Sequence, residues 1–133
     1  MPDLAVDRVK SLDFVQAIIT RLGTNSFTIK GWSIALATAI FAFTAKESHP
    51  RYAALAFLPA VVFWVLDAYY MSLEHAYRDV YNQLANPNSS RDAYDLAETT
   101  SQSYFIEKLF SPSMSFVHAV PILVAIFIIG CLG

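Results

Sequence analysis

The sequence predicts an all-α integral membrane protein with three transmembrane helices, and three observations support this fold class. Hydrophobic residues make up 56% of the 133 residues, above the ~45–50% that is usual in soluble domains. They are concentrated in three blocks, each long enough to cross a bilayer core of roughly 30 Å as a helix. Charged residues make up only 15% of the chain and lie mainly between the blocks. Residues 1–133 are therefore expected to form a single helical membrane domain.

Residues 3–22 are predicted to form an amphipathic helix that ends at Gly23, a natural helix stop. Its apolar side chains recur every three or four positions, at Ala5, Val9, Leu12, Val15, Ile19 and Leu22. Three acidic residues offset three basic ones in this helix. This balance favours packing of the apolar face against a partner helix over a position on the bilayer surface.

Residues 27–45 form the first predicted span, with Asn25 or Ser26 as its N-cap. Lys30 is its only charge and is expected to reach the membrane interface. Small residues share one face of this span, at Gly31, Ala35, Ala39 and Ala42. Small residues at this spacing let helices approach closely in lipid. The alternative is that alanine is simply common in helices.

The second predicted span, residues 52–72, begins a helix that is expected to continue from Tyr52 to Asn86. Such a helix would be about 52 Å long, more than a bilayer core of roughly 30 Å requires. Its far end is therefore predicted to project into water. Three alanines, Ala53, Ala56 and Ala60, share a face that is expected to meet the small-residue face of the first span.

The segment after Asn86 is rich in Pro, Asn and Ser and is predicted to be a loop. Ser90 is a candidate N-cap for a helix over residues 92–109. Residues 67–109 are thus expected to form a cytoplasmic helical layer. The third span is predicted at residues 111–132, which carry no charge, and it should be kinked at Pro121.

Basic residues are distributed unequally on the two sides of the predicted spans. Seven lie in residues 1–30 and 67–108, whereas only Lys46 and Arg51 lie on the other side. The positive-inside rule then places the N-terminus in the cytoplasm and the C-terminus outside.

A polar face at the end of the second span is the first candidate for a functional site. Its residues lie three or four positions apart on the predicted helix: Asp67, Tyr70, Glu74, Arg78 and Tyr81. An acid near the end of a span is costly unless it reaches water, pairs or lines a cavity. These residues are therefore predicted to form the cytoplasmic mouth of a pore, where rings of charge select or gate ions. The alternative is a solvated helix that leaves the lipid with Asp67 at the interface.

Metal-binding and catalytic sites have less support in the sequence. His75 and Asp79 share a face with Glu74 adjacent, but a zinc site needs three or four converging ligands. His118, in the third span, would either bond a carbonyl freed by Pro121 or line a pore. Phosphate-binding loops and nucleophile motifs are absent from the sequence. No enzymatic activity, metal or cofactor is predicted, and a net charge of −2 does not suit duplex nucleic acid.

The helices outside the spans have apolar faces too narrow to build a core from one copy, which favours a homo-oligomer. The segment FLPAVVFWVLDAYYMSLEHAYRDVYNQL (Phe57 to Leu84) resembles a pattern of small bacterial membrane proteins. In that pattern a span ends in Trp, Asp and paired Tyr before a helix of acids, bases and Tyr. The layout is also similar to the SLATT-like membrane effectors of bacterial antiviral defence. A third span at the end departs from the two-span arrangement of that class.

This resemblance implies an oligomer in the bacterial inner membrane that damages or depolarises the membrane when triggered. The function predicted is a homo-oligomeric channel or membrane-perturbing effector, controlled by a cytoplasmic protein or a nucleotide-type ligand. The alternative function is a non-conducting anchor or scaffold that recruits a soluble partner through residues 3–22 and 92–109.

Overall fold

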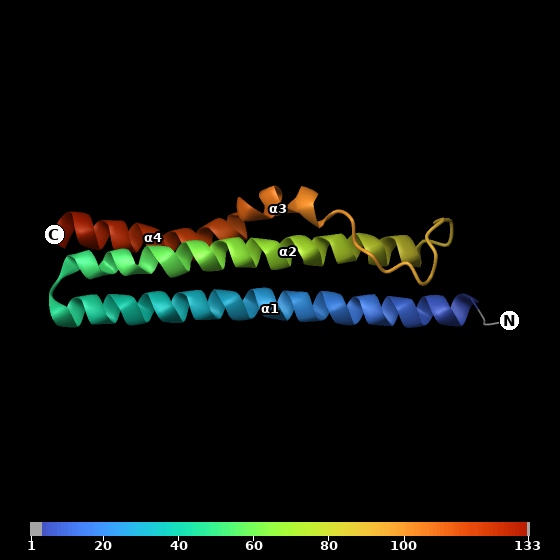
Figure 1. Ribbon diagram of the computed structural model, residues 1–133, viewed down its shortest axis with the longest axis horizontal. Helices are drawn as coiled ribbons and strands as arrows, with labels where there is room; N and C mark the ends of the chain where they lie inside the picture. The colour runs from blue at the N-terminus through green and yellow to red at the C-terminus, as the bar shows by residue number, and fades with distance from the viewer. Residues whose placement is uncertain (1–3, 133) are drawn as a thin grey trace.

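The computed structural model describes residues 4–132, and no strand occurs among them. The elements, in chain order, are α1 (Leu4–Glu47), the 3-10 helix η1 (Pro50–Ala56), α2 (Phe57–Ala85), α3 (Ser101–Leu109) and α4 (Pro112–Leu132). Helix α1 lies antiparallel to η1 and α2 along most of its length (Figure 1). Helix α4 runs beside η1 and the first part of α2 and ends near the turn between α1 and η1. The all-α prediction is confirmed.

Three helical segments are long and apolar enough to cross a membrane: Val6–Glu47, Pro50–Ala85 and Pro112–Cys131. They contain the first two predicted spans and all but the end residues of the third. At 1.5 Å per residue α4 is about 31 Å long, close to a bilayer core of roughly 30 Å, whereas α1 is about 66 Å long. The pair formed by α1 and α2 therefore extends well beyond the region that α4 covers (Figure 1).

The molecule accordingly has two layers. The layer that we call the span layer consists of residues 26–47, 50–68 and 112–132. The stalk consists of residues 4–25 of α1, 69–85 of α2, the connecting segment 86–100 and α3. All three long helices meet in the span layer, whereas the stalk is built on α1 and α2 with α3 packed against α2.

The predicted helix end at Gly23 is wrong, because α1 continues without interruption from Leu4 to Glu47. Asn25 and Ser26 consequently lie inside a helix and are not N-caps. A single buried seam passes through this region and faces α2, η1 and α4: Ser11, Val15, Ile19, Leu22, Ser26, Ile29, Ser33, Ala37 and Thr44. Burial along that seam outweighs the cost of about 1 kcal/mol for one glycine in a helix.

The apolar side chains of the N-terminal region pack within the chain. Val15 and Ile19 form the core of the stalk with Val80 and Leu84 of α2. Val9, from the same predicted stripe, is exposed. Asp3, the first residue of the predicted helix, and the Ala5 side chain lie outside the described part of the structure.

The prediction of one α-helix from Tyr52 to Asn86 is wrong at its start, because residues 50–56 form the 3-10 helix η1. A 3-10 helix has three residues per turn, which places residues three apart on one face. Ala53 and Ala56 are both fully buried on that face and form a cluster with Ala125 of α4. Helix η1 thus presents two small residues to α4.

The predicted helix over residues 92–109 is wrong in its first half, because only Ser101–Leu109 is helical. The side chain of Asp92 accepts a hydrogen bond from the backbone N–H of Tyr94 at 2.8 Å, and Asp95 accepts one from the N–H of Ala97 at 3.4 Å. Such local bonds compete with the helical ladder and favour turns.

The continuity of α1 predicts that Gly23→Ala stabilises the protein. Gly23 is not among residues with positive φ, and an added Cβ would lie 3.4 Å from Oε2 of Glu74, the mobile end of a side chain. The free energy of unfolding in detergent should rise by about 0.5–1 kcal/mol. Gly130→Ala in α4, where nothing lies within 4 Å, is the matched control and should gain as much. A loss at Gly23 beside a gain at Gly130 would contradict a continuous helix.

Candidate functional site

The carboxylate of Asp67 is fully buried in α2 and is bonded by side chains from both α1 and α4. The Nζ atom of Lys30 lies 2.8 Å from Oδ1 and 2.6 Å from Oδ2. The hydroxyl of Ser26 donates to Oδ1 and itself accepts from Lys30 Nζ at 2.8 Å. Nε2 of His118 lies 3.0 Å from Oδ2. One carboxylate therefore ties together the three helices of the span layer.

The imidazole of His118 continues this network. Its ring is fully buried, and its Nδ1 atom lies 3.3 Å from the hydroxyl of Ser33 on α1. The ring of Trp64 stacks on it, with centroids 6.4 Å apart and an angle of 14° between the planes. Trp64 is itself held by a 2.8 Å hydrogen bond from Nε1 to the carbonyl of Leu109. Both nitrogens of His118 thus have side-chain partners, and neither bonds a carbonyl freed by Pro121.

These contacts define what we call the Asp67 cluster: Ser26, Lys30, Ser33, Asp67 and His118. A carboxylate can only accept, so Nε2 of His118 donates to Asp67, and in a neutral imidazole Nδ1 then accepts from Ser33. Asp67 and His118 are both 0% exposed, whereas the side chain of Lys30 is 18% exposed. Lys30 is therefore the member of this pair of contacts that reaches the surface of the chain.

The cluster lies toward the stalk end of the span layer. From Lys30 to the end of α1 at Glu47 the helix rises about 26 Å, and from His118 to Leu132 α4 rises about 21 Å. The rest of the layer is closed by the apolar cluster around Ala53, Ala56 and Ala125, against which Ile40, Phe41, Phe57, Ile128 and Ile129 pack. The polar network thus lies beside the apolar packing of the span layer and reaches the surface of the chain at Lys30.

The five residues predicted as a pore mouth do not form one open face. Only Asp67 belongs to the Asp67 cluster. Glu74 and Arg78 form an ion pair of 2.7 Å in the stalk, with Arg78 56% exposed. Tyr70 is half-buried and packs edge-on against Tyr69. Tyr81 packs against the apolar core of the stalk.

The two sets of small residues predicted to pack together do not meet within a chain. Gly31, Ala35, Ala39 and Ala42 are exposed on the outer side of α1. Ala53, Ala56 and Ala60 are buried. Helix α1 instead presents Ile29, Ser33 and Ala37 to the interior of the span layer. The small-residue face of α1 is left as an outer surface.

The other residues weighed for chemistry hold α3 on the stalk. Tyr104 of α3 donates a 2.7 Å hydrogen bond to Asp79, and its ring packs against His75. The bond to Asp79 raises the pKa of Tyr104, because it stabilises the neutral phenol. The residues described include no group of three or more His, Cys, Asp or Glu side chains suited to a metal.

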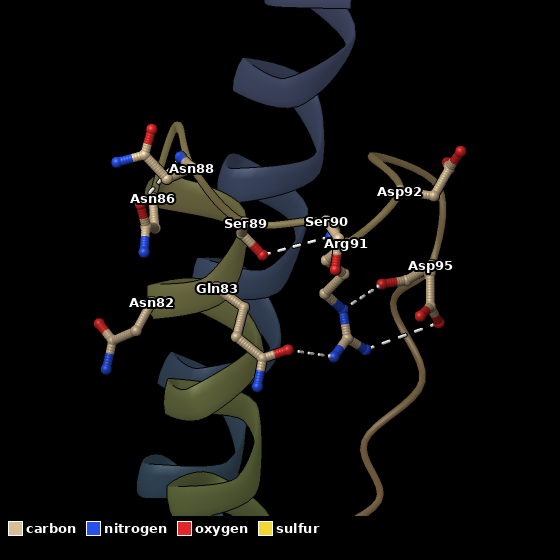
Figure 2. A pocket seen from close by; sticks show the side chains of 9 residues that line it. All are labelled: Asn82, Gln83, Asn86, Asn88, Ser89, Ser90, Arg91, Asp92 and Asp95. Atoms are coloured by element: carbon tan, nitrogen blue, oxygen red, sulfur yellow. Dashed lines mark hydrogen bonds and ion pairs between the residues drawn. The ribbon is translucent and has the colours of Figure 1, made fainter.

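A second polar feature is an open cleft of about 930 Å³ at the end of the stalk, between α2 and the connecting segment. Figure 2 shows Arg91 reaching across it, between Gln83 and Asp95. Its Nη1 donates to Gln83 at 2.7 Å, and its Nε donates to the carbonyl of Asp95 at 2.8 Å. Its Nη2 donates to the carbonyl of Ala97 and lies 3.5 Å from the carboxylate of Asp95. Arg91 therefore organises the connecting segment with most of its donors.

Sequence reasoning missed the partners of Asp67. Lys30 was expected to reach the interface, and His118 was considered alone. The usable signal was that each predicted span contains a single residue of the types Lys, Arg, Asp, Glu and His, namely Lys30, Asp67 and His118. Groups of this kind in apolar helices pair with one another.

Comparisons with known proteins do not identify this arrangement. No protein-family model matches the chain, and no curated protein or solved structure matches it either. The class that the fold and the site define therefore rests on the chain itself: an all-helical protein with three helices able to cross a membrane and a buried Lys–Asp–His network between them.

The burial of Asp67 predicts a large loss of stability for Asp67→Asn. The change leaves the ammonium of Lys30 without its carboxylate, and breaking a buried pair in this way costs about 3 kcal/mol or more. Removing both charges in Lys30→Met with Asp67→Asn should recover part of that loss. Unfolding in detergent micelles measures both. Glu74→Gln, which breaks the partly exposed pair with Arg78, is the matched control and should cost less than about 1 kcal/mol. Equal losses for the two single variants would contradict a special role for the Asp67 site.

Proposed function

We propose that this protein is a homo-oligomeric membrane protein that conducts ions, with the Asp67 cluster as the ion-handling site of its pathway. The observation that carries the proposal is the full burial of Asp67 and His118 between three helices that are long and apolar enough to span a membrane. Ionisable groups at such positions are rare and typically mark ion or proton pathways.

The cost of this arrangement supports a functional reading over a purely structural one. Taking an ammonium and a carboxylate out of water costs several kcal/mol per ion, and apolar residues of similar size often hold helices together as well or better. The Ala53–Ala125 cluster in the same layer shows that these helices also pack through small apolar residues. We therefore infer that the ionisable groups of the Asp67 cluster have a functional role in addition to holding the helices together.

The outer surface of the span layer supports insertion into a bilayer. Large apolar side chains are highly exposed there on all three helices, including Phe27, Trp32, Leu58, Phe116 and Phe127. An apolar surface of this extent is matched by lipid rather than by water. The distribution of basic residues supports an orientation with the stalk and the N-terminus in the cytoplasm and the C-terminus outside. We infer the bacterial inner membrane as the location.

An assembly of several copies is supported by a face of α1 that finds no partner within the described part of one chain. The small-residue face of α1, with Gly31, Ala35, Ala39 and Ala42, is exposed in one chain. Such a face allows a helix of another copy to approach closely in lipid. This supports a symmetric homo-oligomer with the α1 helices at the contact between copies.

The stalk supports control from the cytoplasm. Because α1 and α2 run without a break from the stalk into the span layer, a movement of the stalk reaches Lys30 and Asp67 directly. We propose a cytoplasmic protein or a nucleotide-type ligand as the trigger. A phosphate group bound at the cleft would have to compete with Gln83 and Asp95 for Arg91. This competition favours a protein over a nucleotide-type ligand as the trigger. The similarity of layout to SLATT-like effectors supports depolarisation of the membrane in antiviral defence as the physiological role.

A second candidate function is a non-conducting anchor or scaffold. It is favoured by the large polar cleft on the stalk and by the complete internal pairing of Asp67. In this role the span layer holds the stalk at the membrane, and the stalk recruits a soluble partner.

Dissipation of a membrane potential in liposomes tests the proposed function. Wild-type protein should discharge an imposed potential faster than empty vesicles do, as read by a potential-sensitive dye. Asp67→Asn should lower this rate about tenfold or more, because a loss of 1.4 kcal/mol in the stabilisation of an ion on its path changes the rate tenfold. Glu74→Gln should leave the rate unchanged.

An unchanged potential with correctly inserted wild-type protein would overturn the channel and leave the anchor. A stable cytoplasmic partner bound through the stalk would then support the second candidate.

A further inference from the structure

We infer that the ion handled by the Asp67 cluster is the proton, and that it passes along the chain Ser33–His118–Asp67 to water at Lys30. This inference rests on the proposed function and names the ion that the pathway carries. Three observations support it: the order of the hydrogen bonds, the exposed fractions of the side chains in the cluster, and the partners that already occupy the carboxylate of Asp67.

The carboxylate of Asp67 has no place for a metal cation. The ammonium of Lys30 lies within 2.6 and 2.8 Å of its two oxygens, where a cation would bind. Ser26 and His118 occupy the remaining positions. A second cation at this point would also be repelled by Lys30. A proton, in contrast, needs no coordination shell and moves along bonds that already exist.

The hydrogen bonds form an ordered chain from Ser33, beside the apolar packing, to Lys30, which is partly exposed. Ser33 lies 3.3 Å from Nδ1 of His118, and Nε2 of the same ring lies 3.0 Å from Asp67. Exposure then rises from 0% at His118 and Asp67 to 18% at Lys30. Imidazole can accept a proton on one nitrogen and release one from the other, so the ring joins the two sides.

The transfer can be written in balanced steps. Ser33 passes its hydroxyl proton to Nδ1 of His118 and receives a proton from water on the outer side. The N–H bond at Nε2 then breaks as an O–H bond forms on Asp67 Oδ2, which leaves the imidazole neutral. The ammonium of Lys30, which is bonded to Asp67 and partly exposed, then releases one of its protons to water and takes the proton of Asp67, which regains its charge. One proton enters at Ser33 and one leaves at Lys30, and a turn of the imidazole ring restores the first tautomer.

The surroundings of His118 contain few competing charges. Lys30 from α1 and Asp67 from α2 are the ionisable groups bonded to the cluster, and Trp64 of α2 covers the ring. Among the described hydrogen bonds and ion pairs, η1 and α3 contribute no charged side chain to it. On α4 itself Pro121 has no N–H, so the carbonyl of Val117 lacks its usual helical donor. That carbonyl offers an entering water a partner near His118.

Apolar side chains beyond Ser33 close this pathway at rest. Ile40, Phe41 and Ile128 pack around the small buried alanines there, and a hydrated metal cation would have to displace them. A single file of water needs a much smaller opening. An opening of the contact between α1 and α4 that admits water alone would therefore conduct protons and exclude potassium and sodium.

The test is a comparison of proton, potassium and sodium flux in liposomes that contain the wild-type protein. We expect proton flux, read by a pH-sensitive dye trapped in the vesicles, at least tenfold above the flux of either metal cation at equal driving force. The flux should rise as the pH falls and should be lower in D₂O. Potassium or sodium flux equal to or above that of protons would overturn this inference and leave the proposed function standing. No flux of any ion would overturn both.

Variants test the path itself. His118→Gln should lower proton flux about tenfold or more, and Ser33→Ala, which keeps the packing, should lower it as well. His49→Gln is the matched control, because His49 is exposed in the turn between α1 and η1, and it should leave the flux unchanged. Size-exclusion profiles and circular dichroism establish that the variants fold. A folded Ser33→Ala protein with unchanged proton flux would overturn the proposed path.

Discussion

The contact between Lys30, Asp67 and His118 is the interaction on which the rest of the structure depends. A carboxylate that is fully buried must be paired and hydrogen-bonded, because an uncompensated charge at that position would cost several kcal/mol. Its partners come from α1 and α4, so these helices can sit on α2 in only one register. Apolar packing alone tolerates small shifts along the helix axis, whereas this contact does not. The Asp67 cluster thus sets the geometry of the whole span layer.

The same contact connects the two layers of the molecule. Lys30 belongs to a helix that begins in the stalk, and Asp67 belongs to one that ends there. The stalk is held by its own apolar core around Val15 and Val80 and by the connecting segment organised by Arg91. A stiff pair of helices between these regions transmits movement better than a hinge at Gly23 would. In the proposed function this is how a cytoplasmic trigger reaches the ion-handling site.

Much of the fold could be predicted from local sequence, and the errors have a common cause. The three apolar blocks and the final span follow from hydrophobicity and length, which need no tertiary information. Gly23 and the Asp-rich segment before Ser101 were interpreted by local rules alone. At Gly23 the buried seam along α2 overrides the weak helix propensity of glycine. At Asp92 and Asp95 the side chains bond the backbone and prevent a helix that the spacing of apolar residues suggested.

The sequence by itself determined the all-helical class, the three segments able to cross a membrane and the choice of Asp67 as a candidate functional residue. Composition and hydrophobic blocks are properties of the chain and need no tertiary information. Only the tertiary structure decided that Asp67 faces inward to Lys30 and His118 rather than outward with Glu74 and Arg78. The reason is that residues 30, 67 and 118 are far apart along the chain, and their meeting depends on the register of three helices. That register is fixed by the contacts of Lys30 and His118 with Asp67, which no local pattern specifies.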